Sequence, residues 1–162
     1  MTLSFERRVT MAKYTALQVA HWFIYHNQII VEDMGAEKMT LLKLLKLLYY
    51  AEGCYLAIND GESLFDEKIL AWEHGPVIEE VYNEYADIYN LPVPERTVIE
   101  KEDESLLEQV FKVFGQYSAW ALRNKTHEET PWLEATGNGQ YLNGEISRRI
   151  MMGYFKDNYI AA

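Results

Sequence analysis

Residues 41–59 constrain the fold more than any other segment, because they are apolar on almost every side of a helix. A thin polar strip remains, formed by Lys43, Lys46 and Gly53. A helix with so little polar surface is typical of the buried centre of a helical bundle. The two lysines interrupt the apolar run early, so a membrane-spanning role is the weaker interpretation. Thr40 is placed to cap this helix, and Asn59-Asp60-Gly61 ends it with turn chemistry.

Further segments with helical spacing or helix-start signals are expected to pack around this centre. They are residues 14–31, 75–89, 103–114, 118–122, 130–132 and 145–157. In the second of them, Pro76 stands at the first helical position, where its missing N–H costs nothing. A short extended piece at 69–72 is predicted to pair with residues 97–99. The sequence predicts a mainly α, compact single-domain helical bundle around a central apolar helix, with at most a short β-hairpin-like element.

Acidic residues outnumber basic ones, 25 to 15, and give the chain a net charge of −10. Between residues 73 and 108, eleven acids stand beside only Arg96 and Lys101. Proteins bind nucleic acid by neutralising phosphates with Lys and Arg, so no nucleic-acid partner is expected. The acids form either solvated helix faces or an electrostatic surface for a basic partner. The candidates for that surface are Glu79, Glu80, Glu84 and Asp87.

Nothing in the sequence directs the chain into a membrane. Residues 1–12 contain two arginines but no apolar stretch after them, which excludes a signal peptide. No run reaches the roughly 20 apolar residues that a membrane span needs, so no membrane insertion is expected. The single Cys54 lies in the apolar helical pattern, where a buried hydrophobe is favoured over a reactive thiol. We therefore expect a cytoplasmic protein.

The start of the chain is expected to differ from the rest. Residues 1–13 are predicted to be a flexible leader, followed by a helical domain at 14–160, and Met11 is an alternative start of translation to Met1. The leader is either a frayed terminus or a segment that orders against a partner. In the second case, Leu3 and Phe5 are its candidate contacts.

The sequence contains no recognisable catalytic constellation. It has no Gly-rich phosphate loop, Gly-x-Ser-x-Gly elbow or His-Glu-x-x-His pair. His21 and His26 lie about 140° apart around one helix, a poor arrangement for two metal ligands. His74 and His127 have acidic neighbours, so they either form an acid–base pair or a metal site, or satisfy backbone groups at helix starts. We expect no enzymatic activity, no metal and no cofactor.

Four blocks of sequence stand out together. They are residues 44–53, residues 64–82, residues 126–132 and residues 146–155, and the second contains Ala-Trp-x-x-Gly-Pro-Val-x-x-x-Val-Tyr at 71–82. These blocks resemble the Panacea domain, a family of phage-associated proteins and bacterial antitoxins. The resemblance extends over most of the chain in the family's order, and the block at 71–82 is its most specific part.

The resemblance implies an antitoxin that neutralises a co-encoded toxin by direct protein–protein binding, and the acidity of this chain favours a basic toxin. We expect most of the shared motif to maintain the scaffold. Its residues are Lys46, Tyr49, Trp72, His74, Gly75, Pro76, Tyr82, His127, Pro131 and Trp132. Two alternatives are a phage or prophage accessory protein that binds a host protein, and an enzyme that uses a histidine and a carboxylate. The toxin and the oligomeric state are not predicted.

Overall fold

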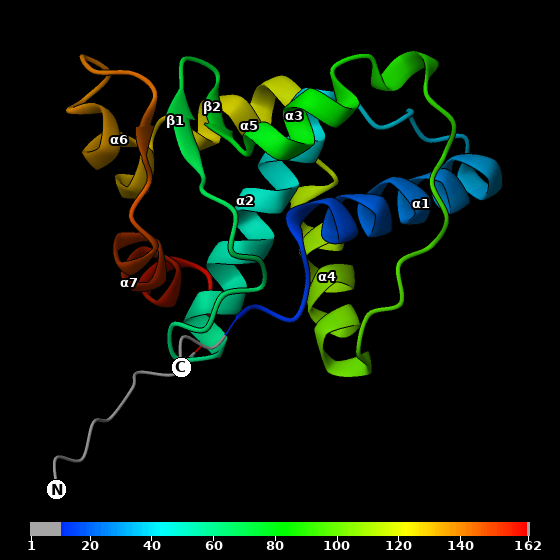
Figure 1. Ribbon diagram of the computed structural model, residues 1–162, viewed down its shortest axis with the longest axis horizontal. Helices are drawn as coiled ribbons and strands as arrows, with labels where there is room; N and C mark the ends of the chain where they lie inside the picture. Colours follow the sequence, from blue (N-terminus) through cyan, green and yellow to red (C-terminus); the bar gives the residue numbers. More distant parts are fainter. Residues whose placement is uncertain (1–10, 162) are drawn as a thin grey trace, which may run out of the picture.

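The fold is built around helix α2, which runs through the middle of the computed structural model (Figure 1). The structure describes residues 11–161. Helix α2 spans Leu41–Ile58, and every residue from Leu44 to Ala57 is buried. The Thr40 hydroxyl caps its first turn by accepting a hydrogen bond from the Lys43 N–H. The predicted central helix is confirmed. Within the described chain, no helix combines the length and apolar character needed to cross a bilayer.

Six other α-helices of the described chain pack on α2 or on its neighbours. They are α1 (Ala16–Met34), α3 (Glu79–Tyr85), α4 (Lys101–Phe114), α5 (Ala119–Thr126), α6 (Thr130–Thr136) and α7 (Arg148–Asn158), and a short 3-10 helix covers Ile88–Asn90. Helix α7 approaches α2 closely, because a Cβ atom at Gly53 would stand 2.3 Å from the Phe155 ring. The predicted mainly α fold with a short hairpin is confirmed.

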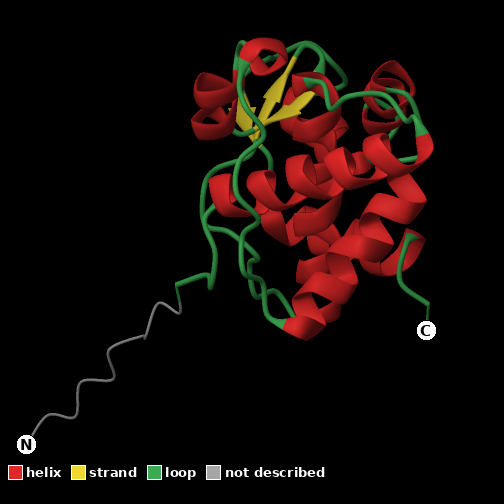
Figure 2. Cartoon of the chain, turned by 90° about the vertical axis from the view of Figure 1, so that its right-hand side faces the viewer, coloured by secondary structure: helices red, strands yellow, loops and turns green. Residues whose placement is uncertain are grey.

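Three short antiparallel strands gather at one end of the molecule (Figure 2). Their bounds are Leu70–Trp72 for β1, Gly75–Val77 for β2 and Gly144–Glu145 for β3. The order is β2-β1-β3, so β1 is the central strand. Trp72 lies opposite Gly75 in the hairpin, and Leu70 lies opposite Glu145 on the other edge.

Three predictions about this region are wrong. Residues 97–99 form no strand, and β1 pairs with β2 and β3 instead. Gly75 and Pro76 do not start a helix, because they form β2 and α3 begins only at Glu79. Gly75 has a φ of +105°, a conformation that L side chains rarely adopt, and Pro76 lacks the N–H that an inner strand needs. The last helix begins at Arg148 rather than at residue 145, because Glu145 belongs to β3.

Helix α2 buries one side chain that was predicted to be buried and one that was predicted to lie on its polar strip. Cys54 is buried as predicted, and burial raises the pKa of its thiol to about 12. Lys46 was expected on a polar strip, but it is 0% exposed. Its ammonium nitrogen donates to the Pro76 carbonyl oxygen at 3.0 Å. The polar-strip prediction is wrong at Lys46, because a strand remote in sequence supplies an acceptor inside the core.

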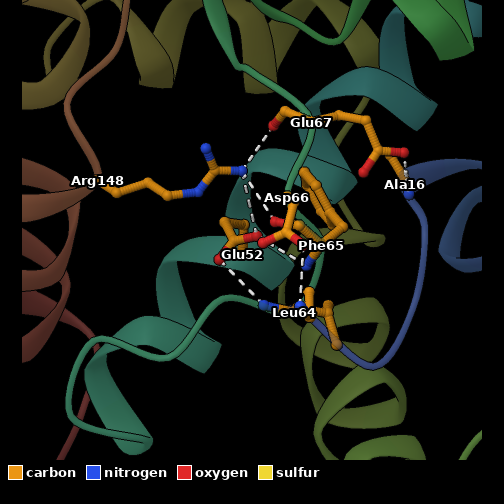
Figure 3. A network of polar contacts seen from close by, with 8 residues as sticks. Ala16, Glu52, Leu64, Phe65, Asp66, Glu67 and Arg148 are labelled. Carbon is orange, nitrogen blue, oxygen red and sulfur yellow. Dashed lines mark hydrogen bonds and ion pairs between the residues drawn. The ribbon is translucent and has the colours of Figure 1, made fainter. Parts of the chain in front are cut away.

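A buried carboxylate organises the loop that follows α2 (Figure 3). Glu52 accepts hydrogen bonds from the backbone N–H groups of Leu64 at 3.1 Å and Phe65 at 3.2 Å. The Arg148 guanidinium of α7 lies 3.6 Å from the Glu52 carboxylate and donates to the carbonyl oxygens of Phe65 and Glu67. Burial raises the pKa of Glu52 to about 7, against the opposing effects of Arg148 and the two backbone donors. This network fixes the loop that joins α2 to β1 and holds it against Arg148 of α7.

The same loop holds the start of the described chain. The Ala12 N–H donates to Asp66 at 2.9 Å, and the Ala16 N–H donates to Glu67 at 2.7 Å. Lys13 forms an ion pair with Glu100 at 2.8 Å, just before α4. Residues 12–16 are therefore attached to the domain by contacts from two separate segments.

Candidate functional site

An apolar groove lies where the start of α2, the β1–β2 hairpin and α3 meet. We call it the hairpin groove. It is lined by Leu41, Leu42, Leu45, Lys46, Trp72, Glu73, His74, Val77, Tyr82, Leu142 and Asn143, and its volume is about 450 Å³. Pockets of a few hundred Å³ with mostly apolar walls and few polar groups are typical binding sites. Three stretches that are distant in sequence, 41–46, 72–82 and 142–143, build it, so its existence depends on the tertiary fold.

Aromatic side chains from the shared motif form one wall of the groove. The rings of Trp72 and Tyr82 meet edge to face, with their centroids 5.0 Å apart. Tyr82 is 37% exposed, and His74 is also exposed at the tip of the hairpin. His74 lies 5.7 Å from the ring of Trp120 on α5, which is 54% exposed. The aromatic surface therefore continues from α3 across the hairpin to α5.

Buried motif residues hold the hairpin against α2 and α5. A Cβ atom at Gly75 would stand 2.6 Å from Lys46 Cε and 2.8 Å from Thr126 Oγ1, so only glycine fits there. Lys46 secures the adjacent strand through the Pro76 carbonyl oxygen. Burial, together with the positive charge of Arg123, lowers the pKa of Lys46 from 10.5 to about 7.

His127, which follows the last residue of α5, and Trp132 of α6 contact the backbone of the same hairpin. The His127 ring nitrogens lie 2.6 Å from the Glu73 carbonyl oxygen and 2.6 Å from the Arg123 carbonyl oxygen. The Trp132 indole N–H donates to the Trp72 carbonyl oxygen at 3.0 Å. Pro131, which is buried, stands in the first turn of α6 and helps to place Trp132. These contacts attach the third motif block to the hairpin backbone.

A second buried polar cluster lies between α2 and the C-terminal end of α7. Glu129 accepts hydrogen bonds from the hydroxyls of Tyr49 at 3.2 Å and Tyr50 at 3.1 Å, and Tyr159 donates to its other oxygen. Burial raises the pKa of Glu129, and the three hydroxyl donors act in the opposite direction. The motif residue Tyr49 therefore lies in this cluster, away from the hairpin groove.

The histidines do not assemble into a metal centre in the part of the chain that the structure describes, where no group of three or more His, Cys, Asp or Glu is suitably arranged. His21 contacts the Tyr85 ring, and His26 stacks on Trp22. Burial lowers the pKa of both imidazoles. His74 faces Trp120, whereas His127 packs against Trp132.

The acidic candidates are all exposed on or just after α3. Glu79 precedes Tyr82 by three residues and shares its face of the helix, whereas Glu80 and Glu84 point about 160° away from Tyr82. Asp87 follows the helix. None of the four has an ion-pair partner among residues 11–161, although other acids of the same stretch do: Glu100 pairs with Lys13, and Glu104 with Arg96. The remaining candidates, Leu3 and Phe5, lie outside the described residues.

Several groove residues were missed by the sequence analysis. Leu142 is 44% exposed and follows Tyr141 in the loop between Gly139 and Gly144. Two large apolar residues in a short Gly-bounded loop are a signal that could have identified this wall of the groove. Trp120 lies outside the groove lining but carries a similar signal, because it is a large aromatic residue that remains exposed on a short helix. Helical periodicity alone identifies neither residue as part of an exposed apolar surface.

The fold and the groove together define a small, mainly helical domain with an exposed aromatic cleft. The family model described as "Antitoxin SocA-like, Panacea domain" matches residues 44–133, more than half of the chain. The chain therefore belongs to the SocA-like antitoxin family with a Panacea domain, which is an antitoxin-like family and not a known enzyme family. Neither the curated proteins nor the solved structures yield a match to this chain.

Proposed function

We propose that this protein is an antitoxin that neutralises a co-encoded toxin by forming a stable complex with it in the cytoplasm. Membership of an antitoxin-like family supports the general role. The hairpin groove carries the binding part of the proposal, because the motif exposes aromatic side chains there instead of burying them all. Tryptophan and tyrosine are the residues most enriched at the energetic centres of protein interfaces.

The test uses the protein encoded by the gene next to this one. Expressed alone, that protein should arrest growth, and co-expression with this chain should restore it. The two purified proteins should elute as one complex in size-exclusion chromatography with light scattering. The proposal would be contradicted if the neighbouring protein is not toxic. It would also be contradicted if that protein is toxic but does not bind this chain and co-expression does not restore growth. Capture of a defined host protein in place of a toxin would favour the accessory-protein alternative.

The exposed acids on and just after α3 form the proposed steering surface for a basic toxin. Glu79, Glu80, Glu84 and Asp87 are exposed and have no ion-pair partners among the described residues. Exposed charges act over about 10 Å at 0.1 M salt and mainly change the association rate. Reversal of all four to lysine should slow association and weaken its dependence on salt. If the association rate and its salt dependence do not change, these acids are only solvated surface residues and do not steer the toxin.

The proposed division of the chain is a leader at 1–13 and a binding domain at 14–160. Ala12 and Lys13 already contact the domain, through Asp66 and Glu100. A leader held at this point could bring Leu3 and Phe5 to a partner bound nearby. We include these two residues as secondary contacts of the toxin, in addition to those made by the domain.

A further inference from the structure

We propose that the hairpin groove binds an apolar side chain carried by a basic segment of the toxin, and that Glu73 and Glu79 contact the Lys or Arg residues flanking it. This inference rests on the proposed antitoxin function and names the chemistry of the partner at one site. It differs from long-range steering, because it concerns contacts made in the finished complex.

The shape and lining of the groove favour an apolar anchor. Its walls combine leucines from the first turns of α2 with the Trp72–Tyr82 pair, and Leu142 closes it from the loop before β3. A volume of about 450 Å³ exceeds that of a single side chain, so an anchor residue and part of its neighbour fit. Exposed apolar surface rimmed by polar groups is characteristic of interaction sites.

The accessible charge at the rim of the groove is negative. Glu73 lines the groove, and Glu79 lies next to Tyr82 on the same face of α3. Neither carboxylate has an ion-pair partner in the described chain. Lys46 is the only Lys or Arg of the lining, but it is fully buried and bonded to the Pro76 carbonyl oxygen. The groove therefore complements a basic segment and disfavours an acidic one.

Aromatic rings beside these carboxylates add to the same preference. Lys and Arg side chains bind favourably over the faces of tryptophan and tyrosine, and their aliphatic stems pack on apolar surface. This chain already shows the geometry, since the Arg123 guanidinium lies 4.7 Å from the centre of the Trp120 ring. A cationic side chain of the toxin can lie over the Tyr82 ring in the same way and form an ion pair with Glu79.

Matched variants test the apolar part of the proposal. Leu142→Asp places a charge in the groove, and Val98→Asp makes a comparable change on a side chain that is 92% exposed and is not part of the groove lining. Binding of each full-length variant to the toxic neighbour is measured by surface plasmon resonance, with thermal melts to check folding. Leu142→Asp should weaken binding at least ~10-fold and Val98→Asp less than ~2-fold. Tyr82→Ala provides a second groove variant without an added charge and should also weaken binding.

A second matched pair separates contact from steering. Glu73→Gln with Glu79→Gln removes the same net charge as Glu80→Gln with Glu84→Gln. Both pairs should slow association to a similar degree, but only the first should raise the dissociation rate, by about 5-fold or more. Equal dissociation rates for the two pairs would overturn the assignment of a basic segment to the groove.

The outcomes distinguish this inference from the proposed function. If growth rescue and wild-type binding occur while Leu142→Asp and Tyr82→Ala bind like the wild type, the groove assignment is wrong and the antitoxin function stands. If the wild-type chain neither binds nor rescues, both proposals fail. If the groove variants bind weakly but their melts show loss of folding, a competition experiment with overlapping peptides that cover the toxin sequence tests the inference on the wild-type chain. A basic peptide with an apolar residue should compete with the toxin for the wild-type chain, and failure of every such peptide would overturn the inference.

Discussion

The buried ammonium of Lys46 makes a specific prediction about stability and pH. Burial and the charge of Arg123 lower its pKa from 10.5 to about 7. Between these values the unfolded chain binds a proton that the folded chain does not, so stability decreases as pH falls from 10.5 towards 7. Since one pKa unit corresponds to about 1.4 kcal/mol, the cost is about 4 kcal/mol near pH 7 and about 2 kcal/mol near pH 9.

The substitution Lys46→Met removes this cost while keeping most of the side chain's volume. It also leaves the Pro76 carbonyl oxygen without its donor, which costs about 1–3 kcal/mol at any pH. We therefore expect Lys46→Met to be more stable than the wild type near pH 7, by roughly 1–3 kcal/mol. Near pH 9 this advantage should fall by about 2 kcal/mol, because the unfolded wild type gains less from protonation.

Urea denaturation at the two pH values measures the effect, and the variant-minus-wild-type difference isolates a single amine. Lys112→Met, at an exposed position in the last turn of α4, controls for the loss of a positive charge. The expected change in the stability difference between the two pH values is about 2 kcal/mol, and the extrapolation error is roughly 0.5 kcal/mol. A stability difference between Lys46→Met and the wild type that is the same at both pH values within ~0.5 kcal/mol would therefore refute the reasoning.

Three further predictions concern the core and the leader. Leu44→Ala and Leu48→Ala, both at fully buried positions of α2, should each lower the free energy of unfolding by about 2–5 kcal/mol in denaturant melts. Losses under ~0.5 kcal/mol for both would mean that the core lies elsewhere. Tyr159→Phe removes one hydroxyl donor to Glu129 and should cost about 1–3 kcal/mol; an unchanged midpoint would show that the other donors suffice. A chain starting at Met11 should melt like the full-length protein yet bind the toxin at least ~10-fold more weakly, and equal affinity would exclude the leader from the interface.

Local pattern predicts the helices of this protein well, because their apolar spacing reflects a single buried face or, for α2, complete burial. The same pattern misplaces Gly75 and Pro76, since proline is acceptable both in the first turn of a helix and on an edge strand. Whether Gly75 and Pro76 form a strand or start a helix depends on Lys46 and Thr126, which surround Gly75 only in the folded state. The local sequence around Gly75 does not indicate that these residues will be its neighbours.

The candidate site was predictable only in part. The block at 71–82 correctly draws attention to the hairpin, but it does not indicate that Trp72 and Tyr82 line a groove. The groove also needs Leu142, which is brought there by the pairing of β1 with β3 across a long stretch of chain. Pairings at such separations are determined by the whole fold, and periodicity within a segment contains no information about them.

The close packing of α7 on α2 has a consequence for synthesis of the protein on the ribosome. Helix α2 leaves the ribosome well before Phe155 of α7, the residue that covers it at Gly53. Domains complete their folding only when the segments that share a core are present. A nascent or prematurely terminated chain therefore exposes an apolar helix to chaperones and proteases. We expect truncation before α7 to yield a product that cellular quality control removes, so that a premature stop codon anywhere before α7 abolishes the protein.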